Sequence, residues 1–311
     1  MDGLLSMLHR TGNLVWVASF PKSGNTWVRM FIATYLAACD RTDLALMKEY
    51  SGSESALCDF AQVAGKPIED LTREDIAAQR DAVQEHLANV FNRHVVKTHC
   101  ARLDLALRPL IVSRLTRAGV YVVRNPLDIV DSLADHANMS LDAAIGWMNE
   151  PSHRLRGTLT HAAQYAGTWS HHVRTWTQHQ EFPLLVMRYE DVKADPVHQF
   201  TRLVRFLEWD YDAERLRRAV ELTSFEALKR AEDLGGFEET SPMARSARFF
   251  RHGRAGRFKE VLSVEQVARV IRDHGEMMRM VGYAAQGDTA EEDTAEGDTA
   301  EGHTPDGSAN G

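Results

Sequence analysis

Anion-binding groups gather in one short turn near the start of the chain. The turn reads Pro21-Lys22-Ser23-Gly24-Asn25-Thr26-Trp27 and lies between the apolar run of residues 14–20 and a helix-like segment. Backbone N–H groups and the helix dipole attract anions at a helix N-terminus, and here Lys22 adds a positive charge while Ser23 and Thr26 add hydroxyl donors. The turn therefore predicts a phosphate site. The alternative is an ordinary strand-to-helix turn in which Thr26 is the N-cap.

This turn differs from the P-loop of nucleotide kinases. That motif, G-x-x-x-x-G-K-[ST], places its Lys after the second glycine and its Ser or Thr on Mg²⁺. Here Lys22 precedes Gly24, the only glycine of the turn. Elsewhere in the sequence no His, Cys, Asp or Glu set has zinc-ligand spacing, and the three cysteines lie far apart. The sequence thus predicts a phosphate site that needs no metal.

Polar side chains follow three further apolar runs, at residues 94–96, 119–123 and 183–187. These followers are Lys97-Thr98-His99, Arg124-Asn125 and Arg188-Tyr189-Glu190-Asp191. In an open parallel sheet, ligands bind beyond the carboxyl ends of the strands, so we expect these groups to meet the phosphate turn in one crevice. Ser132 lies eight residues after Arg124, about two helical turns along, so both can reach one extended anion. Taken alone, His99 is either a structural residue or a proton acceptor.

The elements that must position these groups alternate along the chain. Between the four apolar runs lie helix-like segments at residues 26–38, 73–91, 126–136, 162–179 and 196–207, and residues 212–283 look mostly helical. Continuous apolar strands alternating with amphipathic helices predict a parallel sheet covered on both faces. We therefore expect an α/β fold: a single domain over residues 1–284, with a mainly parallel sheet flanked by helices and a P-loop-like phosphate-binding turn.

Composition and charge narrow the function classes. The chain has 311 residues and a net charge of −8, and the eight acidic residues of 287–311 account for the whole imbalance. That region is a decaying pentad repeat without large apolar residues, so residues 285–311 are predicted to be an acidic, low-complexity, disordered tail. The remaining body is neutral, which argues against nucleic-acid binding. With no apolar run long enough to cross a bilayer and only three cysteines, we expect a cytoplasmic protein without a membrane partner.

Several motifs, in this order, resemble those of the sulfotransferases that use 3′-phosphoadenosine 5′-phosphosulfate (PAPS). They are FPKSGNTW, VVKTH, YVVRNPLDIVDSL, LLVMRYEDVKADP, LTSFEALK and FFRHGRAGRFKE, and they run from about Leu14 to Val264. The resemblance implies transfer of a sulfuryl group from PAPS to an acceptor hydroxyl of a small molecule. It also implies PAPS as co-substrate, 3′-phosphoadenosine 5′-phosphate (PAP) as product, and no metal.

The resemblance also implies which residues hold the donor. The 5′-phosphosulfate loop corresponds to Lys22, Ser23, Gly24, Asn25, Thr26 and Trp27, of which the last also packs on the adenine. The 3′-phosphate ligands correspond to Arg124 and Ser132, and the further nucleotide contacts to Tyr189, Thr223 and Phe225. A C-terminal segment that closes over the 3′-phosphate corresponds to Arg251, His252 and Gly253. This chain has His252 where the family pattern has Lys, and Arg257 where Asp is common.

The catalytic residues implied are His99 as general base, with Lys22 and Lys97 beside the transferred group. A small-molecule kinase that uses ATP is the alternative enzyme, and a non-catalytic nucleotide-binding module is a third interpretation. The segment from Lys259 to Gln266 resembles the short dimer segment of some relatives, which would make the protein a homodimer. Equally, Ser263 can be the N-cap of a helix that begins at Val264.

Overall fold

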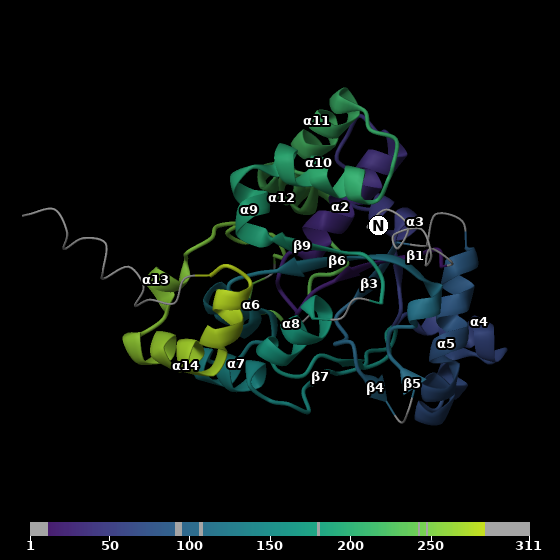
Figure 1. Cartoon of the computed structure of the whole chain (residues 1–311), viewed down its shortest axis with the longest axis horizontal. Helices are drawn as coiled ribbons and strands as arrows, with labels where there is room; N and C mark the ends of the chain where they lie inside the picture. The colour runs from purple at the N-terminus through teal and green to yellow at the C-terminus, as the bar shows by residue number, and fades with distance from the viewer. Residues whose placement is uncertain are drawn as a thin grey trace, which may run out of the picture.

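Five parallel strands form the central sheet in the computed structural model, which describes residues 12–90, 95–105, 108–178, 181–241, 243–246 and 248–283 (Figure 1). Their order is β2 (Gly52–Ser53), β3 (Val95–Thr98), β1 (Leu14–Ala18), β6 (Thr116–Val123) and β9 (Leu184–Arg188). Each neighbouring pair is parallel, as in Val17↔Lys97 and Val17↔Val120. The predicted α/β fold with a parallel sheet is confirmed.

Both faces of the sheet are covered, which explains why its strands are continuous apolar runs. Successive residues of β1 point to opposite faces: Trp16 packs in one core cluster and Val17 in another. The first cluster lies under α8 and α14, and the second under α2, α10 and α11, so these helices form the two outer layers (Figure 1). The bounds of these helices are α2 (Asn25–Ala37), α8 (Trp169–Thr177), α10 (Pro196–Phe206), α11 (Ala213–Leu222) and α14 (Val264–Met280).

Short elements complete the described part of the chain. The other helices are α3 (Leu46–Tyr50), α4 (Leu57–Ala64), α5 (Arg73–Asn89), α6 (Pro126–His136), α7 (Leu141–Met148), α9 (Tyr189–Ala194), α12 (Phe225–Gly235) and α13 (Phe258–Val261). Single 3₁₀ turns lie at Ile68–Asp70 and Ser113–Leu115. Two small antiparallel pairs are β4 (Asp104–Leu105) with β5 (Arg108–Pro109), and β7 (Arg154–Leu155) with β8 (Gln164–Tyr165).

The helix predicted at residues 162–179 is too long. Its first part forms β8 instead, and Gly167 turns the chain with φ +64 before the helix begins. Thr168 is the N-cap of α8, because its hydroxyl accepts a hydrogen bond from the backbone N–H of His171 at 3.1 Å. The residues of 236–257 that the structure describes also hold neither helix nor strand, so the region 212–283 is helical only on either side of them.

The C-terminal helix begins as its sequence predicts. Ser263 and Gln266 form a capping box at the start of α14, while the side chain of Val264 is 80% exposed. The capping interpretation is confirmed, and the homodimer stays a prediction. The predicted tail, residues 285–311, lies outside the described residues and also stays a prediction. No helix within the described ranges combines the length and apolarity that a membrane span requires.

Candidate active site

A cavity of about 1370 Å³ opens at the carboxyl ends of the strands, where the sequence places the polar groups. Of the predicted site residues, those that line it are Lys22, Gly24, Asn25, Thr26, Trp27, Lys97, His99, Arg124, Ser132, Tyr189, Phe225, Arg251, His252 and Gly253. Ser23 and Thr223 lie behind the wall, with side chains almost fully buried. Nearly all of the predicted site residues therefore line one cavity.

The phosphate-binding turn depends on a glycine. Gly24 is the N-cap of α2 with φ +103, and a Cβ at this position would lie 2.7 Å from Cδ2 of Tyr189. The hydroxyl of Ser23 is buried and has no hydrogen-bond partner among the described residues. Such an unsatisfied buried donor beside a helix N-terminus fits a loop that binds phosphate.

The alternative in which Thr26 is the N-cap is wrong. The cap residue is Gly24, without a side-chain hydrogen bond, and the hydroxyl of Thr26 instead donates to Oε2 of Glu239 at 2.7 Å. Asn25 anchors the turn, because its Nδ2 donates to the carbonyl of Val17 at 2.8 Å and its Oδ1 accepts from Nε of Arg29 at 2.8 Å. The start of α2 is thus fixed to the end of β1.

The ring of His99 is held in the orientation and tautomer that a base requires. Its Nδ1 lies 2.8 Å from the carbonyl oxygen of Ser19, which can only accept, so Nδ1 carries the proton and Nε2 is free of it. Burial, together with the charge of Lys97, lowers the pKa of His99 well below 6.5. The imidazole is therefore neutral at pH 7.

A second histidine positions the first. Nε2 of His172 lies 3.2 Å from the carbonyl oxygen of His99, and Nδ1 of His172 lies 2.8 Å from the hydroxyl of Tyr121. A consistent arrangement has Tyr121 donating to His172 and His172 donating to His99. His172 is fully buried and burial lowers its pKa to about 3, so it stays neutral. This series of hydrogen bonds fixes the backbone just after β3.

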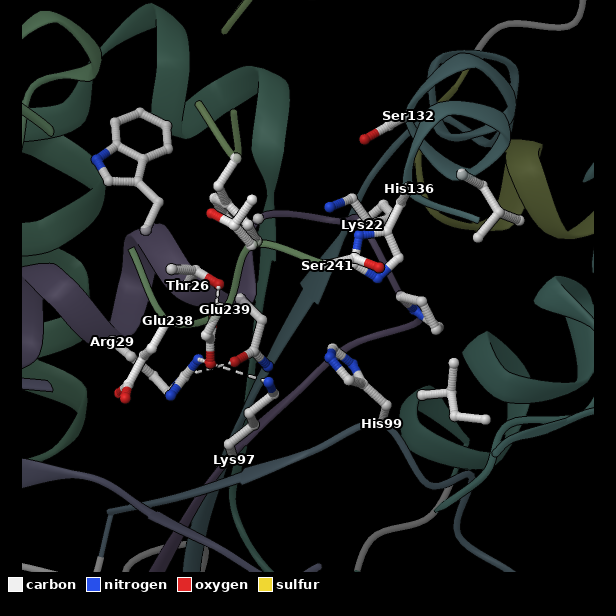
Figure 2. A pocket seen from close by; sticks show the side chains of 18 of the residues that line it. Lys22, Thr26, Arg29, Lys97, His99, Ser132, His136, Glu238, Glu239 and Ser241 are labelled. Carbon is white, nitrogen blue, oxygen red and sulfur yellow. Dashed lines mark hydrogen bonds and ion pairs between the residues drawn. The ribbon is translucent and has the colours of Figure 1, made fainter. Parts of the chain in front are cut away.

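Two charged residues that the sequence did not single out belong to the site. Oε1 of Glu239 lies 2.5 Å from the guanidinium of Arg29 and 3.0 Å from Nζ of Lys97 (Figure 2). Although burial raises it, the pKa of Glu239 is held well below 4.5 by these two cations. Arg29 lies four residues after Asn25, on the same face of α2, which is a usable signal. Glu239 is 210 residues further along the chain from Arg29, and no local pattern marks it.

Lys22 also lies in a strongly cationic setting. Burial, followed by the charge of Arg251, lowers its pKa to about 8, and the charge of Glu239 opposes this shift. Its ammonium lies 4.5 Å from the ring centroid of Phe249. Lys22 is thus a cation that is costly to keep charged without an anion nearby.

Aromatic side chains line another part of the cavity. The indole N–H of Trp27 donates to the carbonyl of Thr223 at 2.8 Å, and its ring meets Tyr189 edge-on with centroids 5.8 Å apart. Thr223 therefore acts on the site by holding Trp27, since its own hydroxyl donates to a carbonyl within α11. A Cβ on Gly253 would lie 2.3 Å from Phe225, so this glycine permits the close approach of the C-terminal segment.

The guanidinium of Arg124 lies in the same part of the cavity. It stacks over the ring of Tyr189 at 4.4 Å from its centroid. It also donates to the carbonyls of Lys22, at 3.2 Å, and Arg254, at 3.3 Å. Arg124 therefore connects the phosphate-binding turn with the C-terminal segment.

Three aspartates of α6 hold that C-terminal segment in place. Asp128 accepts from the backbone N–H groups of Gly256 at 2.7 Å and Phe258 at 3.0 Å. Asp131 pairs with Arg257 at 3.0 Å, and Asp135 pairs with Arg251 at 3.3 Å. The aspartates recur every three to four residues, on one face of the helix, which is the sequence signal for this contact. Arg257, where the family pattern commonly has Asp, thus has a partner on α6.

Comparison with known proteins identifies the family. The family model described as Sulfotransferase domain matches residues 13–282. Sulfotransferase 1B1 of Canis lupus familiaris is 27% identical over 266 residues, which cover 84% of this chain and 82% of that protein. Two solved structures share the fold: mouse sulfotransferase SULT7A1 complexed with PAP (20% identical, TM-score 0.55, 89% of this chain and 88% of that one), and retinol dehydratase in a complex with retinol and PAP (19% identical, TM-score 0.56, 88% and 83%). The resemblance seen in the motifs is confirmed, and the chain belongs to the sulfotransferase family.

Proposed function

We propose that this sulfotransferase moves a sulfuryl group from PAPS to a hydroxyl group of a small-molecule acceptor, with His99 as general base. The observation that carries the proposal is the position of a neutral His99 beside Lys97, in the same cavity as the phosphate-binding turn. The cavity volume of about 1370 Å³ exceeds the roughly 300–1,000 Å³ of pockets for one ligand, so it offers room for a donor and an acceptor.

The residues present fit a bisphosphorylated nucleotide. Ser23 and the N–H groups of α2 would hold the 5′ end, with the unpartnered hydroxyl of Ser23 as the supporting observation. Arg124 and Ser132 would hold the 3′-phosphate, and Trp27, Tyr189 and Phe225 would pack around the adenine. Arg251, His252 and Gly253 would cover the 3′ end, from a segment that is fastened to α6. When bound, PAPS supplies a sulfuryl group activated by its link to phosphate.

Three side chains of the protein have separate roles in this reaction. Nε2 of His99, free of a proton, takes the proton from the acceptor hydroxyl. Lys22 and Lys97 bring positive charge to the 5′ end of the donor, where negative charge grows as the bond to the phosphate breaks. The fixed positions of these groups, rather than covalent chemistry by the protein, would supply most of the rate.

The kinase alternative is not favoured. In a P-loop kinase the loop Lys follows the second glycine of the motif, whereas here Lys22 precedes Gly24, the only glycine of the turn. The family match points the same way.

Apolar side chains also line the cavity, among them Met47, Trp147, Leu155 and Leu159. We therefore expect the hydroxyl to be carried by an apolar scaffold. A cytoplasmic location remains our expectation, supported by the three cysteines, all of which are free.

The test is direct transfer. The protein is incubated with ³⁵S-labelled PAPS and a panel of hydroxylated small molecules, and products are separated by mass and by label. A gain of one sulfate on an acceptor, with release of PAP, is the expected result. If no acceptor gains sulfate and no PAP is released, while an acceptor gains phosphate in the presence of ATP, the kinase alternative would replace the sulfotransferase.

A further inference from the structure

Glu239 is a partly buried acid, and among the described residues its hydrogen bonds and ion pairs go to Thr26, Arg29 and Lys97, all of which line the cavity. Its Oε2 accepts from the hydroxyl of Thr26 at 2.7 Å, and its Oε1 lies 2.5 Å from Arg29 and 3.0 Å from Lys97. Its side chain is only 18% exposed. Figure 2 shows the carboxylate at the centre of these three groups, with His99 beside Lys97. The carboxylate of Glu239 thus places a negative charge of the protein itself at the 5′ end of the site.

Two of these three partners are ones that the donor needs. Thr26 belongs to the phosphate-binding turn and Lys97 flanks the general base, and both line the cavity. Lys97 has a single ammonium with three donors, and Thr26 has one hydroxyl proton. Thr26 therefore cannot donate to Glu239 and to a phosphosulfate at once, and Lys97, whose Nζ lies 3.0 Å from Glu239, has one positive charge for both anions.

The charge balance favours the exchange. Lys22, Arg29 and Lys97 gather around the 5′ end of the cavity, and Glu239 is the acid that pairs with Lys97 and Arg29. Buried cations are costly without a counter-ion, so Glu239 stabilises them in the free protein. The 5′-phosphosulfate carries the same sign of charge and can replace the carboxylate as their counter-ion.

Glu239 lies in a segment whose described residues form neither helix nor strand. It belongs to the turn region after α12, where Thr240 is held by one backbone hydrogen bond to Phe237 and by one side-chain bond to Glu232 at 3.2 Å. Glu238, Glu239 and Ser241 all line the cavity.

We propose that Glu239 is an internal competitor of the donor: its carboxylate occupies the Thr26–Arg29–Lys97 cluster and must be displaced when PAPS binds. This inference rests on the proposed function, because it takes PAPS as the ligand of the cluster. It makes Glu239 a determinant of donor affinity.

Calorimetric titration of PAPS, without acceptor, tests the proposal. Glu239→Gln keeps the size of the side chain and removes the charge, so we expect the Kd for PAPS to fall about tenfold, the value of one charge-assisted contact that no longer has to be broken. Glu238→Gln is the matched control. Glu238 pairs with Lys48 at the rim of the cavity, with side chains 45% and 67% exposed, and its substitution should leave the Kd unchanged.

A second ligand separates competition from a general field effect. Adenosine 3′-monophosphate lacks the 5′ group, so its affinity should be the same for wild type and Glu239→Gln. Equal tightening of both ligands, equal tightening by Glu238→Gln, or weaker PAPS binding by Glu239→Gln would overturn the proposal and make Glu239 a support for Lys97. If Glu239→Gln does not fold, Glu239→Asp, with its shorter reach, should tighten PAPS binding by a smaller factor, and weaker binding again overturns the proposal.

The failure of the proposed function would look different. In that case wild type would bind PAPS no more tightly than adenosine 3′-monophosphate, and there would be no 5′ site for Glu239 to occupy. If wild type binds PAPS much more tightly than adenosine 3′-monophosphate, but Glu239→Gln binds PAPS with unchanged affinity, then Glu239 is not a competitor and the proposed function still stands.

Discussion

Replacement of His99 by Ala should abolish most of the turnover without affecting donor binding. The ring is partly buried, its Nδ1 is used by the carbonyl of Ser19, and its Nε2 is the only nitrogen left to accept a proton. Loss of a general base lowers turnover by about two to four orders of magnitude. The Kd for PAP should change little, because the imidazole is assigned to the acceptor hydroxyl. The assay is single-turnover transfer of ³⁵S, with calorimetry of PAP alongside.

The pH profile gives an independent reading of the same residue. Burial and the charge of Lys97 hold the pKa of His99 well below 6.5, so the acidic fall of kcat/KM should begin only below about pH 6.5. The fall has this direction because protonation of Nε2 removes the base. In His99→Ala the remaining activity should show no such acidic limb.

His136→Ala is the matched control. His136 also lines the cavity, and burial together with the charge of Lys22 lowers its pKa to about 4, so it too is a neutral imidazole near the site. We expect its substitution to leave the acidic limb in place. Near-normal turnover of His99→Ala with an intact limb, and loss of both in His136→Ala, would refute the assignment and move the base to α6.

Other parts of the structure give three further predictions. Arg124→Ala should weaken PAP binding about tenfold or more while leaving adenosine 5′-monophosphate unaffected, as calorimetry can show, because it removes a charge-assisted contact to the 3′-phosphate; equal losses for both ligands would contradict this role. Since no zinc-like ligand spacing occurs in the sequence, EDTA should leave turnover unchanged, and a loss reversed by one divalent ion would argue otherwise. The pKa of buried His172 is lowered to about 3, so its contribution to stability is full above about pH 6.5 and is lost as the pH falls toward 3. Between pH 7 and pH 5 the free energy of unfolding, measured in urea, should therefore drop by about 2 kcal/mol more in wild type than in His172→Gln.

The sheet was predictable because its strands are buried on both faces. Residues 119–123, for example, are apolar or small without interruption, and they lie inside β6. The strand β2 was missed because Gly52 and Ser53 carry no such pattern and pair only through the backbone with β3. The helix α8 was drawn too long because periodicity cannot show that Gly167 adopts φ +64 and that Thr168 caps the helix after it.

In the site, the sequence predicts what each residue type offers but not which charges neutralise one another. Lys22, Lys97 and Arg124 follow strand ends, so topology alone brings them together. The partner of Lys97 comes from residue 239, in a region whose described residues hold neither helix nor strand, and no spacing rule connects the two.

The same contact explains why Thr26 was misjudged. A Thr at the start of a helix predicts a cap, and the cap is worth about 1 kcal/mol. A hydrogen bond to a charged carboxylate is worth about 1.5–3 kcal/mol, so the hydroxyl turns to Glu239 and Gly24 takes the cap position. The N-cap preference of Thr26 is thus outweighed by its hydrogen bond to Glu239, a residue far away in the sequence. This contact lies among the cations of the site, which the proposed chemistry needs.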